Sequence, residues 1–372
     1  MKTRIAFLIA VCVLALQGRA QVTASLSASV ENSGPGQSAV FCGTLTNTGS
    51  TQAFLNNITF SLTGLAGTDV VSGSNAFYQN VPGILPAGAS YTGPLFSAAI
   101  ASGAPSGDYA GSVTVQGGTN IFMTNALASA PFTVESPSVS IVASTPTAYE
   151  SGPQRGAFMI TRTGGTTTSL AVSYAIGGTA VNGTDYETIS SPVTIGPGFS
   201  SGYVVITPIL RQMVLGSRTV TVTLQTSAQY SLGAQTSGTV TIEDTFFNQW
   251  RQQYFGAAAN SPRAAANADW SASGITNELA YALGINPTNP SQALLPVVSV
   301  QSNYLTLSFV PNQTAADVTY SVQASTDLIN WSTTNVQEAF DSNPNGEAFQ
   351  YINPLGPGTP EVFLRLLVTP LD

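Results

Sequence analysis

Short runs in which apolar residues alternate with Ser, Thr or Asn cover most of this chain and constrain its fold more than any other feature. Examples lie at residues 39–45, 157–162 and 304–310. A period of two places successive side chains on opposite faces of a β-strand. Clusters of Gly, Pro and Asn separate the runs and mark turns. The pattern predicts a mainly β protein built from β-sandwiches in tandem.

One segment breaks the two-residue period. In residues 246–255 and again in 275–283 the apolar residues recur at helical spacing. Gly284 directly follows the second run and suits the C-terminal cap of a helix. We therefore expect a short two-helix segment before the last sandwich.

The first twenty residues have the composition of a secretory signal: Lys2 and Arg4, an apolar run at 5–16 too short to span a membrane, and Gly18-Arg19-Ala20 before a cleavage point. We expect a secreted protein, extracellular or in the cell envelope, without a membrane span in its mature chain. Loss of the three basic residues would change the formal charge from −8 to −11 and leave a chain without Lys or His.

These counts exclude several functions. Without His, neither a Ser-His-Asp nucleophile nor a His-ligated zinc is possible. Seven scattered arginines cannot form a nucleic-acid-binding patch. An enzyme would have to rest on carboxylates alone, and few aromatic residues lie near them in sequence to form a cleft. We therefore expect no enzymatic activity. The one mature cysteine, Cys42, lies in an apolar run and is expected to be a buried small hydrophobe, with interchain pairing as the alternative.

Acidic residues in the second block lie only where strands start or stop. The block contains Glu-Ser-Gly at 150–152, Gly-Thr-Ala at 178–180 followed by Gly-Thr-Asp-Tyr at 183–186, and Thr-Ile-Glu-Asp at 241–244. With this spacing, residues 138–245 resemble a Calx-β domain. The resemblance implies a two-sheet immunoglobulin-like sandwich with a calcium site at one tip.

Carried over residue by residue, the resemblance makes Glu150, Asp185, Glu243 and Asp244 the candidate calcium ligands. A middle acidic cluster of that family is missing, and Arg211 stands in its place. Since calcium affinity depends on the number of charged oxygen ligands, we expect a weak site, with Arg211 pairing with a remaining acid. The alternative is that these acids make ordinary turn hydrogen bonds.

A second loop has oxygen-bearing residues at alternating positions, from Asp269 through Ser271 and Ser273 to Gly274, with Asn277 beyond. It is similar to an Asp-rich calcium segment found near the C-terminus of many bacterial secreted proteins, but serines replace its acids. The alternative to a degenerate calcium loop is Ser or Asn capping of a short helix.

The flanking modules also resemble parts of large bacterial exported proteins. The phrases Thr-Asn-Thr-Gly at 46–49 and Ser-Gly-Asp-Tyr at 106–109 are typical of their immunoglobulin-like modules, and Ser-Thr-Asp-Leu at 325–328 recurs in their C-terminal modules. The predicted organisation is a signal at 1–20, sandwiches at 21–135 and 136–245, a two-helix linker at 246–290 and a C-terminal sandwich at 291–372.

These observations predict a non-enzymatic secreted or cell-surface protein with a structural or adhesive role, binding an extracellular protein or a polysaccharide. The alternative is a calcium- or glycan-binding module protein whose calcium site lies at the tip of the second sandwich.

Overall fold

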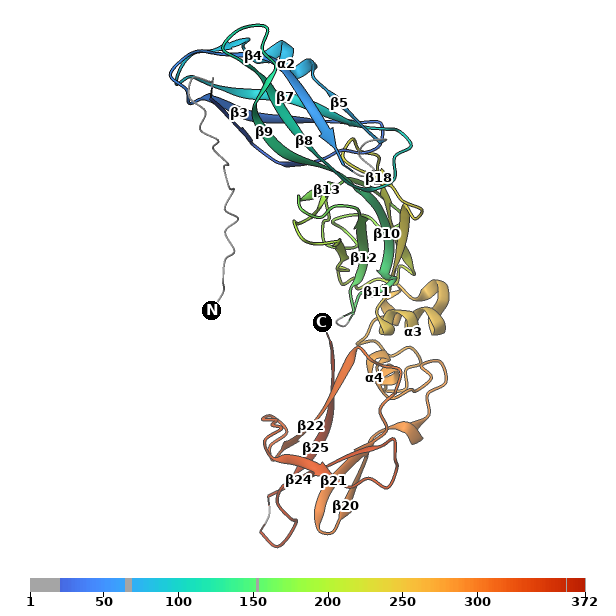
Figure 1. Cartoon of the computed structure of the whole chain (residues 1–372). Helices are drawn as coiled ribbons and strands as arrows, with labels where there is room; N and C mark the ends of the chain where they lie inside the picture. Colours follow the sequence, from blue (N-terminus) through green and yellow to red (C-terminus); the bar gives the residue numbers. More distant parts are fainter. Residues whose placement is uncertain (1–20, 64–68, 152–153, 359, 372) are drawn as a thin grey trace.

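The computed structural model describes residues 21–63, 69–151, 154–358 and 360–371. The signal predicted at residues 1–20 lies outside these ranges. The chain is mainly β and forms successive modules that lie end to end (Figure 1). The described residues bury three hydrophobic clusters, one within 22–134, one within 139–242 and one that begins at Val214 and continues to Val322. The prediction of tandem immunoglobulin-like sandwiches with a two-helix segment before the last is confirmed.

The first module is a sandwich of two sheets with one short helix. One sheet has the order β1 (Val22–Leu26), β3 (Ser38–Asn47), β7 (Ser90–Ile100), β5 (Val70–Gly73). The other has the order β2 (Val30–Asn32), β9 (Asn125–Ser136), β8 (Gly107–Gly118), β4 (Ala53–Leu62), β6 (Ile84–Leu85). Helix α2 (Asn75–Asn80) follows β5. Phe41 and Phe96 stack between the sheets with ring centroids 4.7 Å apart, and Phe132 packs against both.

The side chain of Cys42 is exposed, so the expectation that it is a buried small hydrophobe is wrong. Burial along β3 alternates strictly, so Phe41 and Leu45 point into the core, while Cys42 shares the outer face with Val40. An apolar run on a strand with one solvated face does not bury all its members.

The second module is also a sandwich. One sheet has the order β16 (Ser201–Ile206), β12 (Gly156–Thr163), β10 (Ser138–Thr145), β18 (Ser231–Leu232). The other has the order β11 (Thr147–Tyr149), β19 (Ser237–Glu243), β17 (Arg218–Leu224), β14 (Tyr174–Gly177). A separate two-stranded antiparallel sheet pairs β13 (Leu170–Val172) with β15 (Val193–Ile195).

The helices and the last sheets share one core. Helix α3 (Phe246–Phe255) and helix α4 (Asn277–Ala282) are separated by short 3-10 turns, Gly256–Ala258 and Pro262–Ala264, and a third turn, Gln292–Leu294, follows. A four-stranded sheet has the order β20 (Val297–Gln301), β21 (Tyr304–Phe309), β24 (Glu347–Tyr351), β23 (Val336–Ala339). A two-stranded sheet pairs β22 (Val318–Ser325) with β25 (Phe363–Pro370). Trp250 and Tyr281 from the helices lie in the same cluster as Phe309 and Val322, so a continuous core crosses the expected boundary at residue 290.

The first two modules meet without a linker. Strand β9 ends at Ser136 and β10 begins at Ser138, so only Pro137 separates them. Glu135 is 0% exposed, and its carboxylate accepts hydrogen bonds from the N–H of Thr167 (2.8 Å) and the hydroxyl of Thr168 (3.2 Å). A buried carboxylate of one module is therefore satisfied by a loop of the next.

Candidate functional site

Three of the four predicted calcium ligands lie at the end of the second sandwich that faces the helices. Glu150 follows β11, Asp185 lies in the loop between β14 and β15, and Asp244 follows β19. All three are buried, at 6%, 6% and 2% exposure. The strand ends that carry them meet at one tip, as the sequence pattern predicted.

The group at their centre is the guanidinium of Arg218, the first residue of β17. It donates hydrogen bonds to one oxygen of Glu150 and one of Asp185, and its Nη2 lies 3.7 Å from an oxygen of Asp244. A guanidinium offers five donors in a fixed plane and suits several carboxylates at once. Arg218 therefore forms a buried ion-pair network with three of the predicted ligands.

Backbone N–H groups hold the outer oxygens of these carboxylates. The second oxygen of Asp185 accepts from Val181 at 2.7 Å, and the corresponding oxygen of Asp244 accepts from Leu215 at 3.0 Å and from Gly216 at 2.8 Å. The contact from Val181 is a turn hydrogen bond of the kind given as the alternative to calcium binding, and the contacts from Leu215 and Gly216 tie Asp244 to the loop that precedes β17.

Glu243, the fourth predicted ligand, is not part of this network. It is the last residue of β19, where successive side chains point to opposite faces, and its carboxylate accepts a hydrogen bond of 2.5 Å from the hydroxyl of Ser217. The parity of the strand thus directs Glu243 away from the tip that Asp244 reaches.

The prediction that the side chain of Arg211 pairs with one of the remaining acids is wrong. Its guanidinium donates to the carbonyl of Thr184 at 3.1 Å, and only its backbone N–H approaches Glu150, at 3.3 Å. The arginine that pairs with the acids, Arg218, was overlooked. Its signal in the sequence is parity, because Arg218 falls on the same inward-facing positions of β17 as Val220, Val222 and Leu224. An arginine at a core position needs buried acceptors.

The network carries more negative than positive groups. Burial raises the pKa of Glu150 above its ordinary value, against the lowering effect of the hydrogen bond from Arg218. Arg251, on α3, also interacts electrostatically with Asp244. Arg251 itself is buried and donates to the carbonyls of Gln212 (2.9 Å) and Ala259 (2.6 Å).

The donor set does not fit calcium as it stands. In residues 21–63, 69–151, 154–358 and 360–371, no group of three or more His, Cys, Asp or Glu side chains is placed to hold a metal ion. Calcium takes six to eight oxygen ligands, but here the guanidinium of Arg218 engages the inner oxygens of Glu150 and Asp185. An ion would have to displace Arg218.

The second predicted loop is closed by its own hydrogen bonds. Burial opposes ionisation of Asp269, but hydrogen bonds from the N–H groups of Gly274 (2.6 Å) and Ser271 (3.1 Å) and from the Ser273 hydroxyl together lower its pKa. Asn277 points elsewhere and donates to backbone carbonyls, including that of Ala265 at 2.8 Å. The cap of α4 is Thr276, which accepts from Leu279.

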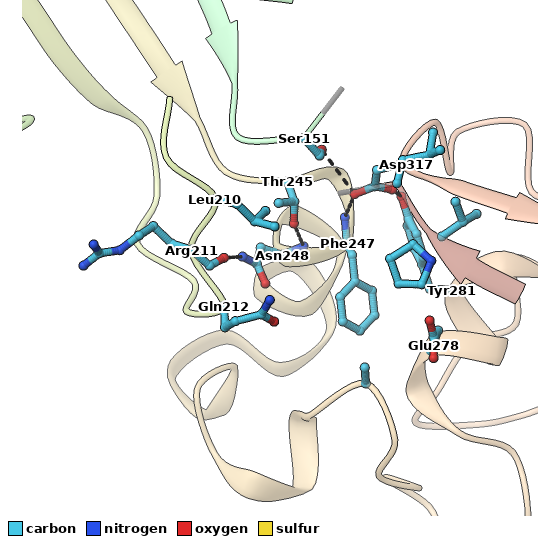
Figure 2. Close-up of a pocket in the computed structure, with 14 residues that line it drawn as sticks. Ser151, Leu210, Arg211, Gln212, Thr245, Phe247, Asn248, Glu278, Tyr281 and Asp317 are labelled. Carbon is cyan, nitrogen blue, oxygen red and sulfur yellow. Dashed lines mark hydrogen bonds between the residues drawn. The ribbon is translucent and has the colours of Figure 1, made fainter. Parts of the chain in front are cut away.

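A small cavity lies where the second sandwich, the helices and the last sheets meet (Figure 2). Its volume is about 140 Å³, and it is lined by Ser151, Leu210, Arg211, Gln212, Thr245, Phe247, Asn248, Ala266, Glu278, Tyr281, Asp317, Val318, Pro370 and Leu371. Ser151, Phe247 and Tyr281 converge on Asp317. Asp317 is buried and accepts from the N–H of Phe247 at 2.9 Å, from the hydroxyl of Ser151 at 3.4 Å and from that of Tyr281. Burial and the neighbouring Asp317 raise the pKa of Tyr281.

No family model and no curated protein matches the sequence. Among solved structures, the apo-form Calx CBD1 domain is similar over 30% of this chain and 98% of its own length, with 22% identity and a TM-score of 0.26. The calcium binding domain CBD12 of CALX1.1 is similar over 59% and 99%, with 12% identity and a TM-score of 0.24. The D00-D0 domain of intimin is similar over 60% and 100%, with 8% identity and a TM-score of 0.27.

None of the helices within the described residues combines the length and the hydrophobicity needed to cross a membrane.

Proposed function

We propose that this chain is a non-enzymatic, exported structural protein that acts as a stiff spacer in the cell envelope or outside the cell. The observation that carries the proposal is the way in which adjacent modules are joined. At each junction a buried carboxylate of one module accepts a hydrogen bond from the second sandwich, Glu135 from the loop at Thr167 and Asp317 from the hydroxyl of Ser151.

Hydrogen bonds and ion pairs also support a structural role for the acids at the tip of the second sandwich. Glu150, Asp185 and Asp244 are held by Arg218 and by backbone donors. Carboxylates engaged in this way are not positioned to exchange protons with a substrate. They stabilise the end of the second sandwich on which the helices pack.

Small-angle X-ray scattering of the mature chain tests the proposal. A stiff chain gives one elongated particle whose scattering is fitted by a single conformation. Replacement of Glu135 by Ala should broaden the distribution of maximum dimensions, while Glu187→Ala, at an exposed carboxylate of the second sandwich, should leave it unchanged. Wild-type scattering that requires an ensemble of module orientations would contradict the spacer role.

The calcium-binding alternative has its own test. Calorimetry with millimolar calcium and melting curves with and without the ion would show heat and a raised Tm if the second sandwich binds it. With Arg218 among the acids, we expect neither.

A further inference from the structure

The end of the first sandwich farthest from the second has an unusual turn. Strands β8 and β9 form a long hairpin, and its turn holds Ile121 and Phe122 between Asn120 and Met123. The Ile121 side chain is 65% exposed and that of Phe122 is 91% exposed. The central positions of such turns are usually Gly, Pro, Asn or Asp.

This turn is ordered. The N–H of Met123 donates to the carbonyl of Asn120 at 3.3 Å, and the N–H of Phe122 donates to the Asn120 side chain at 2.9 Å. From β4, the amide of Asn56 donates to the carbonyls of Asn120 (3.1 Å) and Met123 (2.7 Å). The fold thus holds two large apolar side chains in solvent, where they contribute nothing to the core.

Other exposed apolar side chains lie at the same end. Ile84 is 46% exposed, and its strand pairs with β4 at Phe54, which pairs in turn with Gly118 at the base of the turn. Two strand spacings, roughly 10 Å, separate these positions. Tyr78, 57% exposed, donates its hydroxyl to Asn57, farther along β4. The exposed polar residues nearby carry amides and hydroxyls: Gln79, Asn80, Thr119, Asn120, Thr124 and Asn125.

The charged side chains of this module lie at its opposite end. Residues 21–135 contain four charged residues, Glu31, Asp69, Asp108 and Glu135. Glu31 pairs with Val134, and Asp108 pairs with Glu135, beside the second sandwich. The carbonyl of Asp69 accepts a hydrogen bond from the N–H of Ala101, and Ala101 follows Ile100 at the same end of the sheet. Strand β8 spans 12 residues, so the turn lies roughly 35 Å from these charges.

We propose that this end of the first sandwich, defined by Tyr78, Ile84, Ile121 and Phe122, binds an uncharged polysaccharide. A sugar chain offers C–H faces to aromatic and aliphatic side chains and hydroxyls to the amides around them. This end carries no Lys or Arg side chain, so on an acidic protein it has little attraction for nucleic acid or for an anionic membrane. The inference rests on the proposed spacer role, since the spacer then carries its ligand site at its tip.

The test is retention of the full mature chain on insoluble cellulose and chitin and its mobility in gels that contain dextran. Wild type should bind at least one of these polymers, and Phe122→Ala should weaken binding by at least about tenfold, the size of effect typical of an aromatic anchor. Phe340→Ala is the matched control, because Phe340 is 84% exposed but lies in the last module. It should bind as wild type does.

Binding should also be insensitive to sodium chloride, because no charges take part. Both variants should melt at the wild-type temperature, since neither side chain is buried. Lack of binding to all three polymers would overturn the proposal, as would an equal loss in Phe340→Ala. Binding to phosphatidylglycerol vesicles alone, or Phe122-dependent dimerisation in ultracentrifugation without polysaccharide binding, would also overturn it. None of these outcomes bears on the stiffness measured by scattering.

Discussion

The carboxylate of Glu135, at the end of the first sandwich, accepts a hydrogen bond of 2.8 Å from the backbone N–H of Thr167 in the second. Glu135 has no exposed surface, so the contact can form only when the two modules hold one relative orientation. Burial of an unsatisfied carboxylate is costly. Any other arrangement of the two modules would lose this contact and is therefore disfavoured.

Gly165 allows that approach and gives the first prediction. A Cβ atom at Gly165 would lie 2.2 Å from side-chain atoms of Glu135. We expect Gly165→Ala to destabilise the junction by about 1–3 kcal/mol, as overpacking of buried sites does, and to broaden the scattering-derived dimensions. Gly177→Ala, where an added Cβ meets nothing within 4 Å, is the control. Equal urea midpoints for Gly165→Ala and wild type would show that the junction is loose.

A second prediction concerns Arg218. Replacement by Met leaves Glu150, Asp185 and Asp244 buried without their cation, and we expect a loss of about 3–5 kcal/mol in the free energy of unfolding. Arg155→Met, at an exposed arginine, should cost little. The emptied cluster should then gain stability from millimolar calcium, visible as a Tm rise in Arg218→Met but not in wild type. A rise in wild type would instead indicate that calcium displaces Arg218.

Glu150 gives a prediction for pH dependence. Since burial raises its pKa above the ordinary value of 4.5, the folded protein keeps this proton at pH values at which the unfolded chain has lost it. The resulting stabilisation is present below pH 4.5 and is lost as the pH rises through the raised pKa. Urea unfolding from pH 4 to 7 should therefore show wild type losing stability relative to Glu150→Gln, with Glu187→Gln as control. A difference that does not change with pH contradicts the prediction.

The packing of the helices on the last sheets can be tested by a double-mutant cycle. Tyr281 and Asp317 are both buried and hydrogen-bonded, so Tyr281→Phe and Asp317→Asn should each destabilise the chain, with a coupling energy of about 1–3 kcal/mol between them. Tyr203→Phe removes an exposed hydroxyl and should be neutral. Additive losses for Tyr281→Phe and Asp317→Asn would mean that this hydrogen bond does not hold α4 against the last sheets.

Strong periodicity made several elements predictable. Residues 246–255 form a helix with the bounds expected, and the runs at 157–162 and 304–310 form β12 and β21. Strand β7, which contains Gly93 and Pro94, was missed, and so was α2. A strand interrupted by Gly and Pro lacks the alternation that marks a strand, and a six-residue helix shows too few turns to reveal a period.

The sequence by itself determined the mainly β fold and the order of the modules, because these depend on side-chain alternation and turn signals, which are local. The resemblance to a Calx-β domain added the tip at which Glu150, Asp185 and Asp244 meet. Only the tertiary structure placed Arg218 among those acids, turned Glu243 toward Ser217 and closed the junctions through Glu135 and Asp317. Each of these contacts depends on strand parity and on segments distant in the chain packing together. Electrostatic and hydrogen-bond partners are chosen by that packing.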